Sequence, residues 1–130
     1  MDRLCERLLR RIAVAGIAVL AAGCGSATEL AVDGPVYARA VDGQVAVTNG
    51  SEREIFTTMF GLQSSALIDW VACVEGPACQ PLGSGMTRTA SVHAIEGIEE
   101  THAIVYWWHA VAGMDGVTHP DSIRWFRVKL

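Results

Sequence analysis

The hydrophobic positions of this chain follow two different patterns. Residues 12–24 form one uncharged run of small and aliphatic side chains, whereas from residue 36 onward apolar and polar residues alternate in short runs. Alternation with a period of two is typical of strands that bury one face. No window of about 12 residues in the second region has a helical period. The second region is therefore predicted to be all-β.

Seven short runs in this region are predicted to be strands, and turn residues separate them. The runs are residues 36–41, 44–49, 55–62, 67–73, 86–93, 103–111 and 123–128. Asp42 and Gly43 join the first two runs and are typical of a two-residue hairpin, because both central positions of that turn need a positive φ. Residues 63–68 are expected to form at most one helical turn.

Seven strands in about 95 residues, with turns at regular intervals, resemble an immunoglobulin-like β-sandwich. The resemblance covers residues 36–130 and depends on the number and spacing of the strands. We therefore expect a single sandwich domain over these residues. A small closed β-barrel is the alternative architecture.

The first 23 residues have the layout of a secretory signal peptide, with four arginines before the uncharged run. The run is shorter than the about 20 residues that a membrane-spanning helix needs. It ends in Leu20, two alanines, a glycine and Cys24, which resembles the lipobox of bacterial lipoproteins, although Ala21 stands where that family usually has leucine. An ordinary signal peptide cleaved nearby, or an uncleaved membrane helix, is the alternative.

The lipoprotein resemblance implies cleavage before Cys24, lipidation of Cys24 and a tether over residues 24–35. It extends to small bacterial lipoproteins with an immunoglobulin-like domain, which are similar in having a Trp shortly before a Cys-containing turn and a late Tyr-Trp-Trp strand. That family implies no activity. Gly25 is not the aspartate associated with inner-membrane retention, so the resemblance implies the outer membrane where the host has one.

Loss of residues 1–23 would make the protein more acidic. The full chain has 10 basic and 14 acidic residues, and the first 23 hold four arginines and two acids, which leaves six basic and 12 acidic residues and a net charge of −6. Such a surface repels nucleic acid and anionic lipid head groups. Membrane contact is therefore expected through the lipid on Cys24.

Two cysteines, Cys73 and Cys79, remain in the predicted domain, with Gly76 and Pro77 between them. In an oxidising compartment such a pair is predicted to form a disulfide that pins a turn. A redox-active pair usually has the spacing Cys-x-x-Cys at a helix start, and a zinc site would need two further ligands nearby.

The sequence matches no known catalytic motif in full, so we expect no enzyme, no catalytic residue and no cofactor. The segment 83–85 is shorter than the nucleophile elbow of hydrolases, and the segment 99–102 lacks the second histidine of a metalloprotease helix. A hydrolase whose site is assembled from loops stays an alternative. So does an envelope protein that binds copper, because histidine and methionine are a suitable soft ligand set. Its candidate ligands are His93, His102, His109, His119, Met59, Met86 and Met114.

Aromatic residues concentrate in the run 103–111, which places Tyr106 and Trp108 on one face and Trp107 on the other. A sandwich core covers one face of a strand, so one of Trp107 and Trp108 is expected to be more exposed than the other. The alternative is a strand whose tryptophans fill a small core. Trp125 on the last strand extends one of the two faces. Tyr106, Trp107, Trp108 and Trp125 are therefore the candidate binding residues. The function expected is a lipid-anchored, non-catalytic binding or structural module of the bacterial cell envelope, with an envelope protein or a glycan as partner.

Replacement of Cys24 by serine tests the predicted anchor. Each buried methylene of an acyl chain contributes about 0.8 kcal/mol to membrane binding, so loss of the chains should release the processed protein from the membrane. We expect Cys24→Ser to move the protein from the membrane fraction to the soluble fraction of lysed cells. A Cys24→Ser protein that stays as firmly bound as the wild type would contradict the prediction.

Overall fold

The computed structural model describes residues 28–130, so the predicted signal peptide and Cys24 lie outside the described residues. Within this range the chain forms nine strands and one helix of four residues, and every pair of neighbouring strands is antiparallel. In the same range, no helix has the length and apolar character needed to cross a membrane.

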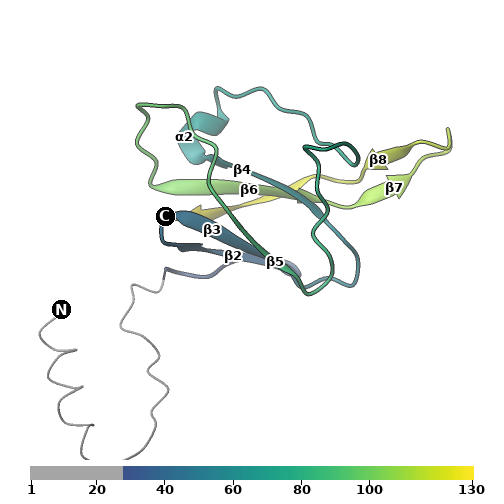
Figure 1. Ribbon diagram of the computed structural model, residues 1–130, viewed down its shortest axis with the longest axis horizontal. Coiled ribbons are helices and arrows are strands. Elements are labelled where there is room, and N and C mark those ends of the chain that lie inside the picture. The colour runs from purple at the N-terminus through teal and green to yellow at the C-terminus, as the bar shows by residue number, and fades with distance from the viewer. Residues whose placement is uncertain (1–27) are drawn as a thin grey trace, which may run out of the picture.

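Two sheets pack face to face, and a third sheet projects from them (Figure 1). The first sheet has the strand order β1-β2-β3-β5, with β1 at Ala31–Asp33, β2 at Val36–Val41, β3 at Gln44–Asn49 and β5 at Thr87–Ala90. The second has the order β4-β6-β9, with β4 at Phe56–Gly61, β6 at His102–Trp108 and β9 at Arg124–Lys129. The projecting sheet is the hairpin of β7 (Ala110–Ala112) and β8 (Thr118–Pro120).

This strand order confirms the predicted immunoglobulin-like sandwich. In that fold one sheet contains strands A, B and E and the other contains C, F and G. Here β2, β3 and β5 take the places of A, B and E, while β4, β6 and β9 take those of C, F and G. The place of strand D falls to residues 66–86, which form no strand.

The turn between β2 and β3 has the predicted geometry. Asp42 and Gly43 both have a positive φ, of 49° and 78°, and Val41 pairs with Gln44. This backbone conformation matches the right-handed twist of the strands that it joins. The alternation along both strands therefore points one set of side chains, including Val36 and Val45, into the core.

The main core lies between the two sheets. It consists of twelve buried residues, which are Val36, Ala38, Val45, Val47, Ile55, Met59, Leu82, Ala103, Val105, Trp107, Phe126 and Val128. Trp107 is the largest of them. Its indole Nε1 donates to Asp33 Oδ2 (2.9 Å), and Arg124 donates to Asp33 Oδ1 (2.7 Å) while its guanidinium lies 5.1 Å from the Trp107 ring centre. Asp33 thereby joins the edge of the first sheet to the second.

The structure corrects the prediction at several places. Residues 67–73 form no strand, because they lie across the outer side of the second sheet instead of pairing at an edge (Figure 1). The run 103–111 breaks at His109, where the chain leaves β6 and enters the separate hairpin. Strand β1 lies inside the segment predicted to be a tether and pairs with β2, so the folded domain begins earlier than residue 36.

The predicted helical turn is present as α2 (Leu62–Ser65), and Glu100 holds it. The Glu100 carboxylate accepts hydrogen bonds from Gln63 N (2.9 Å), Ser64 N (2.7 Å) and Ser64 Oγ (2.8 Å). A Cβ at Gly61 would overlap the Glu100 side chain, so this close approach needs glycine. Burial raises the pKa of Glu100, but these hydrogen bonds outweigh it and hold the pKa below its ordinary value of 4.5.

Glu100→Gln should change how stability depends on pH. A carboxyl whose pKa is lower in the folded state stabilises the fold above its unfolded pKa, and this contribution is lost as the pH falls through the folded pKa. We expect the wild type to be more stable than Glu100→Gln near neutral pH and the difference to shrink in acid. Denaturant unfolding of both proteins from about pH 7 to about pH 3 would measure it. A difference that stays constant over this range would contradict the prediction.

Candidate functional site

The two faces of β6 divide its aromatic residues as predicted. Trp107 points into the main core, whereas Tyr106 and Trp108 lie on the outer side of the second sheet. However, the exposed fraction is 3% for Trp107 and 2% for Trp108. The expectation that one of the two tryptophans is the more exposed is therefore wrong. The reason is that residues 66–80 cover the outer side, which gives the strand a second buried face.

Trp70 of this cover packs on aromatic rings of β4 and β6, and together they form a second, smaller core. The Trp70 ring centre lies 4.6 Å from that of Tyr106 and 5.9 Å from that of Trp108. On the other side, Phe56 stacks on Trp108 with ring centres 6.3 Å apart and planes 18° apart. Aromatic pairs in such offset arrangements stabilise a fold beyond the area that they bury. Trp70 therefore contributes to the fold through contacts of its side chain and not through strand pairing of its backbone.

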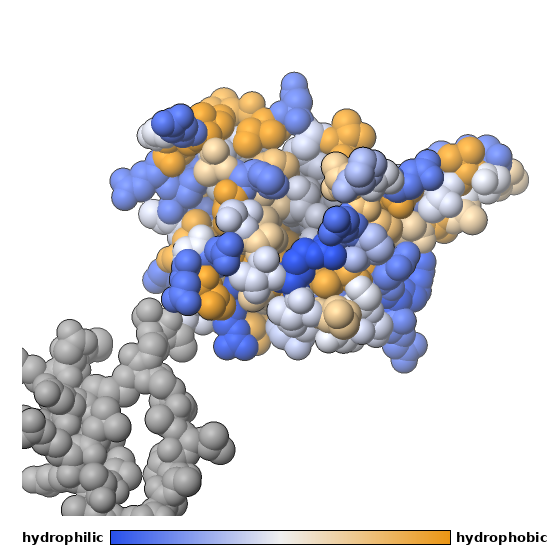
Figure 2. All heavy atoms as spheres, in the orientation of Figure 1, coloured by the Kyte–Doolittle hydropathy of each residue, from blue (hydrophilic) through white to orange (hydrophobic). Residues whose placement is uncertain are grey.

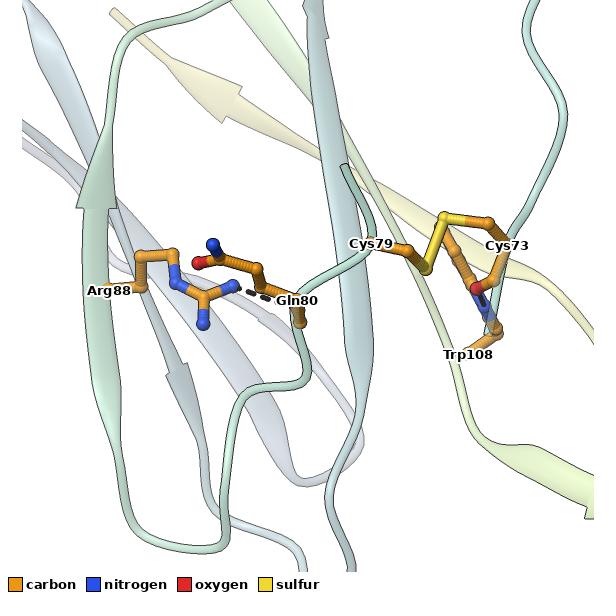
Figure 3. The surroundings of a disulfide bond; sticks show 5 residues. All are labelled: Cys73, Cys79, Gln80, Arg88 and Trp108. Carbon is orange, nitrogen blue, oxygen red and sulfur yellow. Dashed lines mark hydrogen bonds between the residues drawn. A yellow bond between two sulfur atoms is a disulfide. The ribbon is translucent and has the colours of Figure 1, made fainter. Parts of the chain in front are cut away.

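The predicted disulfide between Cys73 and Cys79 is confirmed, and it closes the cover over Trp108 (Figure 3). The Trp108 indole Nε1 donates to Cys73 O at 2.8 Å, so the backbone of the cover also satisfies the one polar atom of the buried ring. Closing so short a loop contributes about 2 kcal/mol. The disulfide thus fixes the position of the turn on the sheet.

Trp125 is the one candidate binding residue with a largely exposed side chain. It pairs across the sheet with Tyr106, and 55% of its surface is exposed. Tyr106 itself is half-buried between Trp125 and Trp70. Arg127 and Lys129 follow at alternate positions of β9, so two cations share the face of Trp125. This surface, Trp125 with Tyr106, Arg127 and Lys129, is called the β9 face below.

The histidines named as candidate copper ligands lie on separate elements. The His93 ring packs 5.7 Å from that of Phe60, and His109 Nδ1 lies 3.0 Å from Glu54 O. His102 contacts Thr101. Over residues 28–130, no group of three or more His, Cys, Asp or Glu side chains is placed to hold a metal ion.

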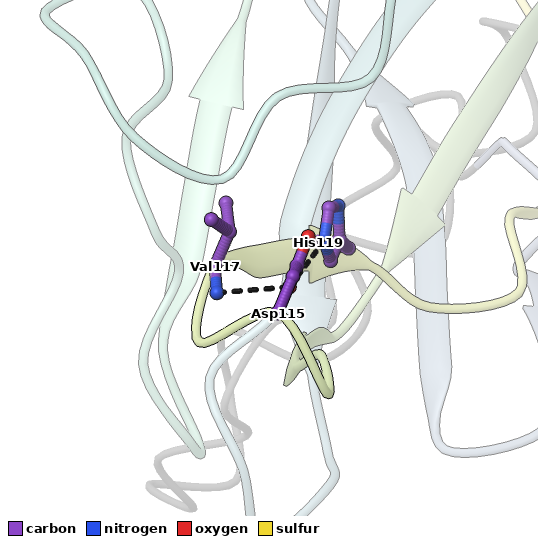
Figure 4. Close-up of polar contacts among 3 residues, drawn as sticks. All are labelled: Asp115, Val117 and His119. Carbon is purple, nitrogen blue, oxygen red and sulfur yellow. Dashed lines mark hydrogen bonds and ion pairs between the residues drawn. The ribbon is translucent and has the colours of Figure 1, made fainter.

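His119 belongs to the projecting hairpin. Its Nε2 lies 2.9 Å from Asp115 Oδ2, and Val117 N donates to Asp115 Oδ1 at 3.0 Å (Figure 4). The bond from Val117, followed by that from His119, lowers the pKa of Asp115. Figure 2 shows apolar side chains along this hairpin and over α2 and the segment after it. Met114 at the hairpin tip is fully exposed, and Val71 in the cover is 88% exposed.

Two adjoining hollows lie beside β4, and the sequence analysis missed both. The first, of about 190 Å³, lies under the cover and is lined by Phe56, Trp70, Val71, Cys73, Cys79, Gln80 and Trp108. The second, of about 140 Å³, lies toward β5 and is lined by Met59, Arg88, Ala90, Ser91 and His93. Thr57, Thr58 and Ala78 line both. No sequence signal marks them, because they depend on where residues 66–86 leave the edge of β4 uncovered.

The described surface therefore offers a ligand three kinds of non-covalent contact, which are an exposed indole, cationic side chains and the edge of a strand. Comparison of the chain with protein-family models, with curated proteins and with solved structures found no match.

Replacement of either buried tryptophan should destabilise the domain to a similar degree. Trp107→Ala leaves a cavity in the main core and Trp108→Ala leaves one in the second core. Each should lower the free energy of unfolding by about 3–5 kcal/mol. Val71→Ala is the control, because its side chain is 88% exposed, and it should change stability by less than about 0.5 kcal/mol. Chemical denaturation followed by circular dichroism gives these values. The two-core description fails if Trp108→Ala is as stable as the control.

Proposed function

We propose that this protein is a lipid-anchored, non-catalytic binding module of the bacterial cell envelope. The signal-like N-terminus and the lipobox-like segment ending in Cys24 support export and anchoring. The disulfide supports an oxidising compartment, because structural disulfides are rare where thiols are kept reduced. The lipid would hold the protein at the membrane, and the domain would face the aqueous side.

The exposure of Trp125 carries the binding part of the proposal. A tryptophan that is 55% exposed loses the stabilisation that its burial would give, and in this fold two other tryptophans of the same sheet are almost fully buried. Interface hot spots are rich in tryptophan, tyrosine and arginine. The β9 face brings these three residue types together, through the pairing of Tyr106 with Trp125 and the position of Arg127 two residues further along.

An envelope glycan or an envelope protein suits the β9 face. Aromatic rings provide rigid apolar area together with a polar tip, which serves both kinds of ligand. The mature net charge of −6 makes nucleic acid an unsuitable partner. Arg127 and Lys129 would direct the face toward a partner with negative charge.

Trp125→Ala should weaken binding without weakening the fold. The test is co-sedimentation of the full chain, in detergent, with purified cell-wall sacculi and separately with beads that carry detergent-extracted envelope proteins. We expect Trp125→Ala to lose at least about tenfold in affinity, which corresponds to a hot-spot contribution of about 1.4 kcal/mol or more. Unfolding of the same variant should match the wild type within about 0.5 kcal/mol.

Two control variants distinguish binding through the β9 face from non-specific binding through exposed apolar side chains. Trp125→Phe keeps an aromatic ring and should retain part of the affinity, whereas Leu67→Ala removes an exposed apolar side chain from the cover and should have no effect on binding. Equal sedimentation of the wild type and Trp125→Ala with both materials would refute the β9 face as the binding surface.

A further inference from the structure

The outer edge of β4 is paired at its two ends and open between them. At one end Ile55 and Leu82 exchange two backbone hydrogen bonds, of 3.0 and 2.7 Å. At the other end His93 N donates to Met59 O (3.2 Å) and Gly61 N donates to His93 O (2.8 Å). Successive residues of a strand point their backbone groups to opposite edges, so the odd-numbered residues of β4 face this outer edge and the even-numbered ones pair with β6.

Thr57 lies in the middle of this open stretch. Its N–H and C=O face outward, as does the N–H of Met59, and none of the three has a hydrogen-bond partner among residues 28–130. Unpaired backbone groups that are shielded from water are costly, so native structures pair nearly all of them. Both Thr57 and Met59 lie at the wall of the hollows beside β4, where a ligand can reach them.

The two hollows meet at this open stretch and differ in chemistry. The first is lined by the rings of Phe56 and Trp108 and by the disulfide, so it suits an apolar side chain. The second is lined by Arg88, His93 and Ser91, so it offers polar and cationic groups. Arg88 donates to Gln80 O at 3.1 Å (Figure 3) and to Pro81 O at 2.9 Å. These bonds use two of its five N–H groups and leave others for a carboxylate.

We propose that the groove beside β4 binds an extended polypeptide segment of a partner protein, which adds to the sheet as a short strand. A peptide presents an N–H and a C=O at the spacing that Thr57 offers, and this main-chain pairing is the usual basis of strand addition. Successive side chains of an added strand point to opposite faces, so one residue would enter the apolar hollow and the next would reach Arg88.

The geometry also limits the length and composition of the segment. The bridges to Leu82 and His93 close the groove at both ends, which leaves room for about three residues at about 3.3 Å per residue. The segment should therefore contain an apolar residue followed or preceded by an acidic one, with small residues around them. This site is separate from the β9 face and does not depend on the function proposed for Trp125.

Nuclear magnetic resonance of the full chain in detergent tests the proposal with a defined probe. The probe is the blocked peptide N-acetyl-Ala-Leu-Glu-amide, which has the length and composition that the groove allows, and its matched control carries N-methyl groups on the backbone, which cannot donate to Thr57. We expect the probe to shift the amide resonances of Thr57 and Met59 and to slow their hydrogen exchange. We expect the methylated control to do neither.

Thr57→Pro removes one of the two N–H groups of the open stretch while leaving the β4–β6 pairing intact, because the Thr57 N–H faces away from β6. It should weaken probe binding roughly tenfold, the loss expected for one or two main-chain hydrogen bonds, whereas Thr57→Val keeps the N–H and should bind within about threefold of the wild type. If Thr57→Pro does not fold, Ala78→Leu takes its place, since Ala78 is exposed and lines both hollows.

The outcomes separate this proposal from the one for the β9 face. Strand addition is supported if the wild type shows shifts centred on Thr57 and Met59, and if the Met59 shift is lost in Thr57→Pro or both shifts are lost in Ala78→Leu. Shifts confined to Tyr106 and Trp125, equal binding by the wild type and both variants, or no shift at millimolar probe would each overturn it, and none of these results bears on the sedimentation of Trp125→Ala.

Discussion

Burial of β6 on both of its faces is the constraint on which the rest of this structure depends. The strand carries Trp107 and Trp108 at consecutive positions, so the two indoles must point to opposite sides of the sheet. The packed first sheet covers Trp107, but nothing in a two-layer sandwich covers Trp108. Residues 66–80 cover Trp108 from the outer side of the sheet. The Cys73–Cys79 disulfide and the hydrogen bond from Trp108 Nε1 to Cys73 O hold this segment in place.

The use of this segment as a cover leaves an edge of the sandwich incomplete. In an immunoglobulin-like domain, the chain between strands C and E usually contributes one or more strands to an edge. Here the corresponding residues pack through their side chains, chiefly Trp70, and their contact with the edge of β4 is an isolated bridge from Leu82 to Ile55. The second core and the open backbone at Thr57 therefore have one cause, which is that residues 66–80 lie on the face of the second sheet and not at its edge. The proposed strand addition would supply from outside the pairing that this path omits.

Local patterns predicted most of the strands but not the path between them. Alternation and the Asp42-Gly43 turn located the first hairpin, because both depend on neighbouring residues only. The spacing of the cysteines predicted their disulfide for the same reason. The prediction of a strand over residues 67–73 is wrong, because an apolar segment has the same composition whether it pairs at the edge of a sheet or packs onto its face. Tertiary packing decides between the two.

The candidate site shows the same division. The sequence named Tyr106 and Trp125, and their pairing follows from the strands that hold them. It could not tell that Trp107 and Trp108 are both covered, since that requires knowing where residues 66–80 lie. No pattern in the sequence marks Thr57 as a candidate binding residue. Its importance comes from its backbone and from the two bridges on either side, which involve residues far along the chain.

The projecting hairpin of β7 and β8 has a practical consequence for experiments on this protein. It pairs with neither sheet of the sandwich, and its tip closes on itself through the bonds from Gly113 N to Val117 O and from Gly116 N to Gly113 O. Exposed loop tips of this kind tolerate inserted sequence. An epitope or a fluorophore-binding tag placed after Asp115 would lie away from both cores and from the groove beside β4. It would allow the protein to be followed in living cells without altering either end of the chain.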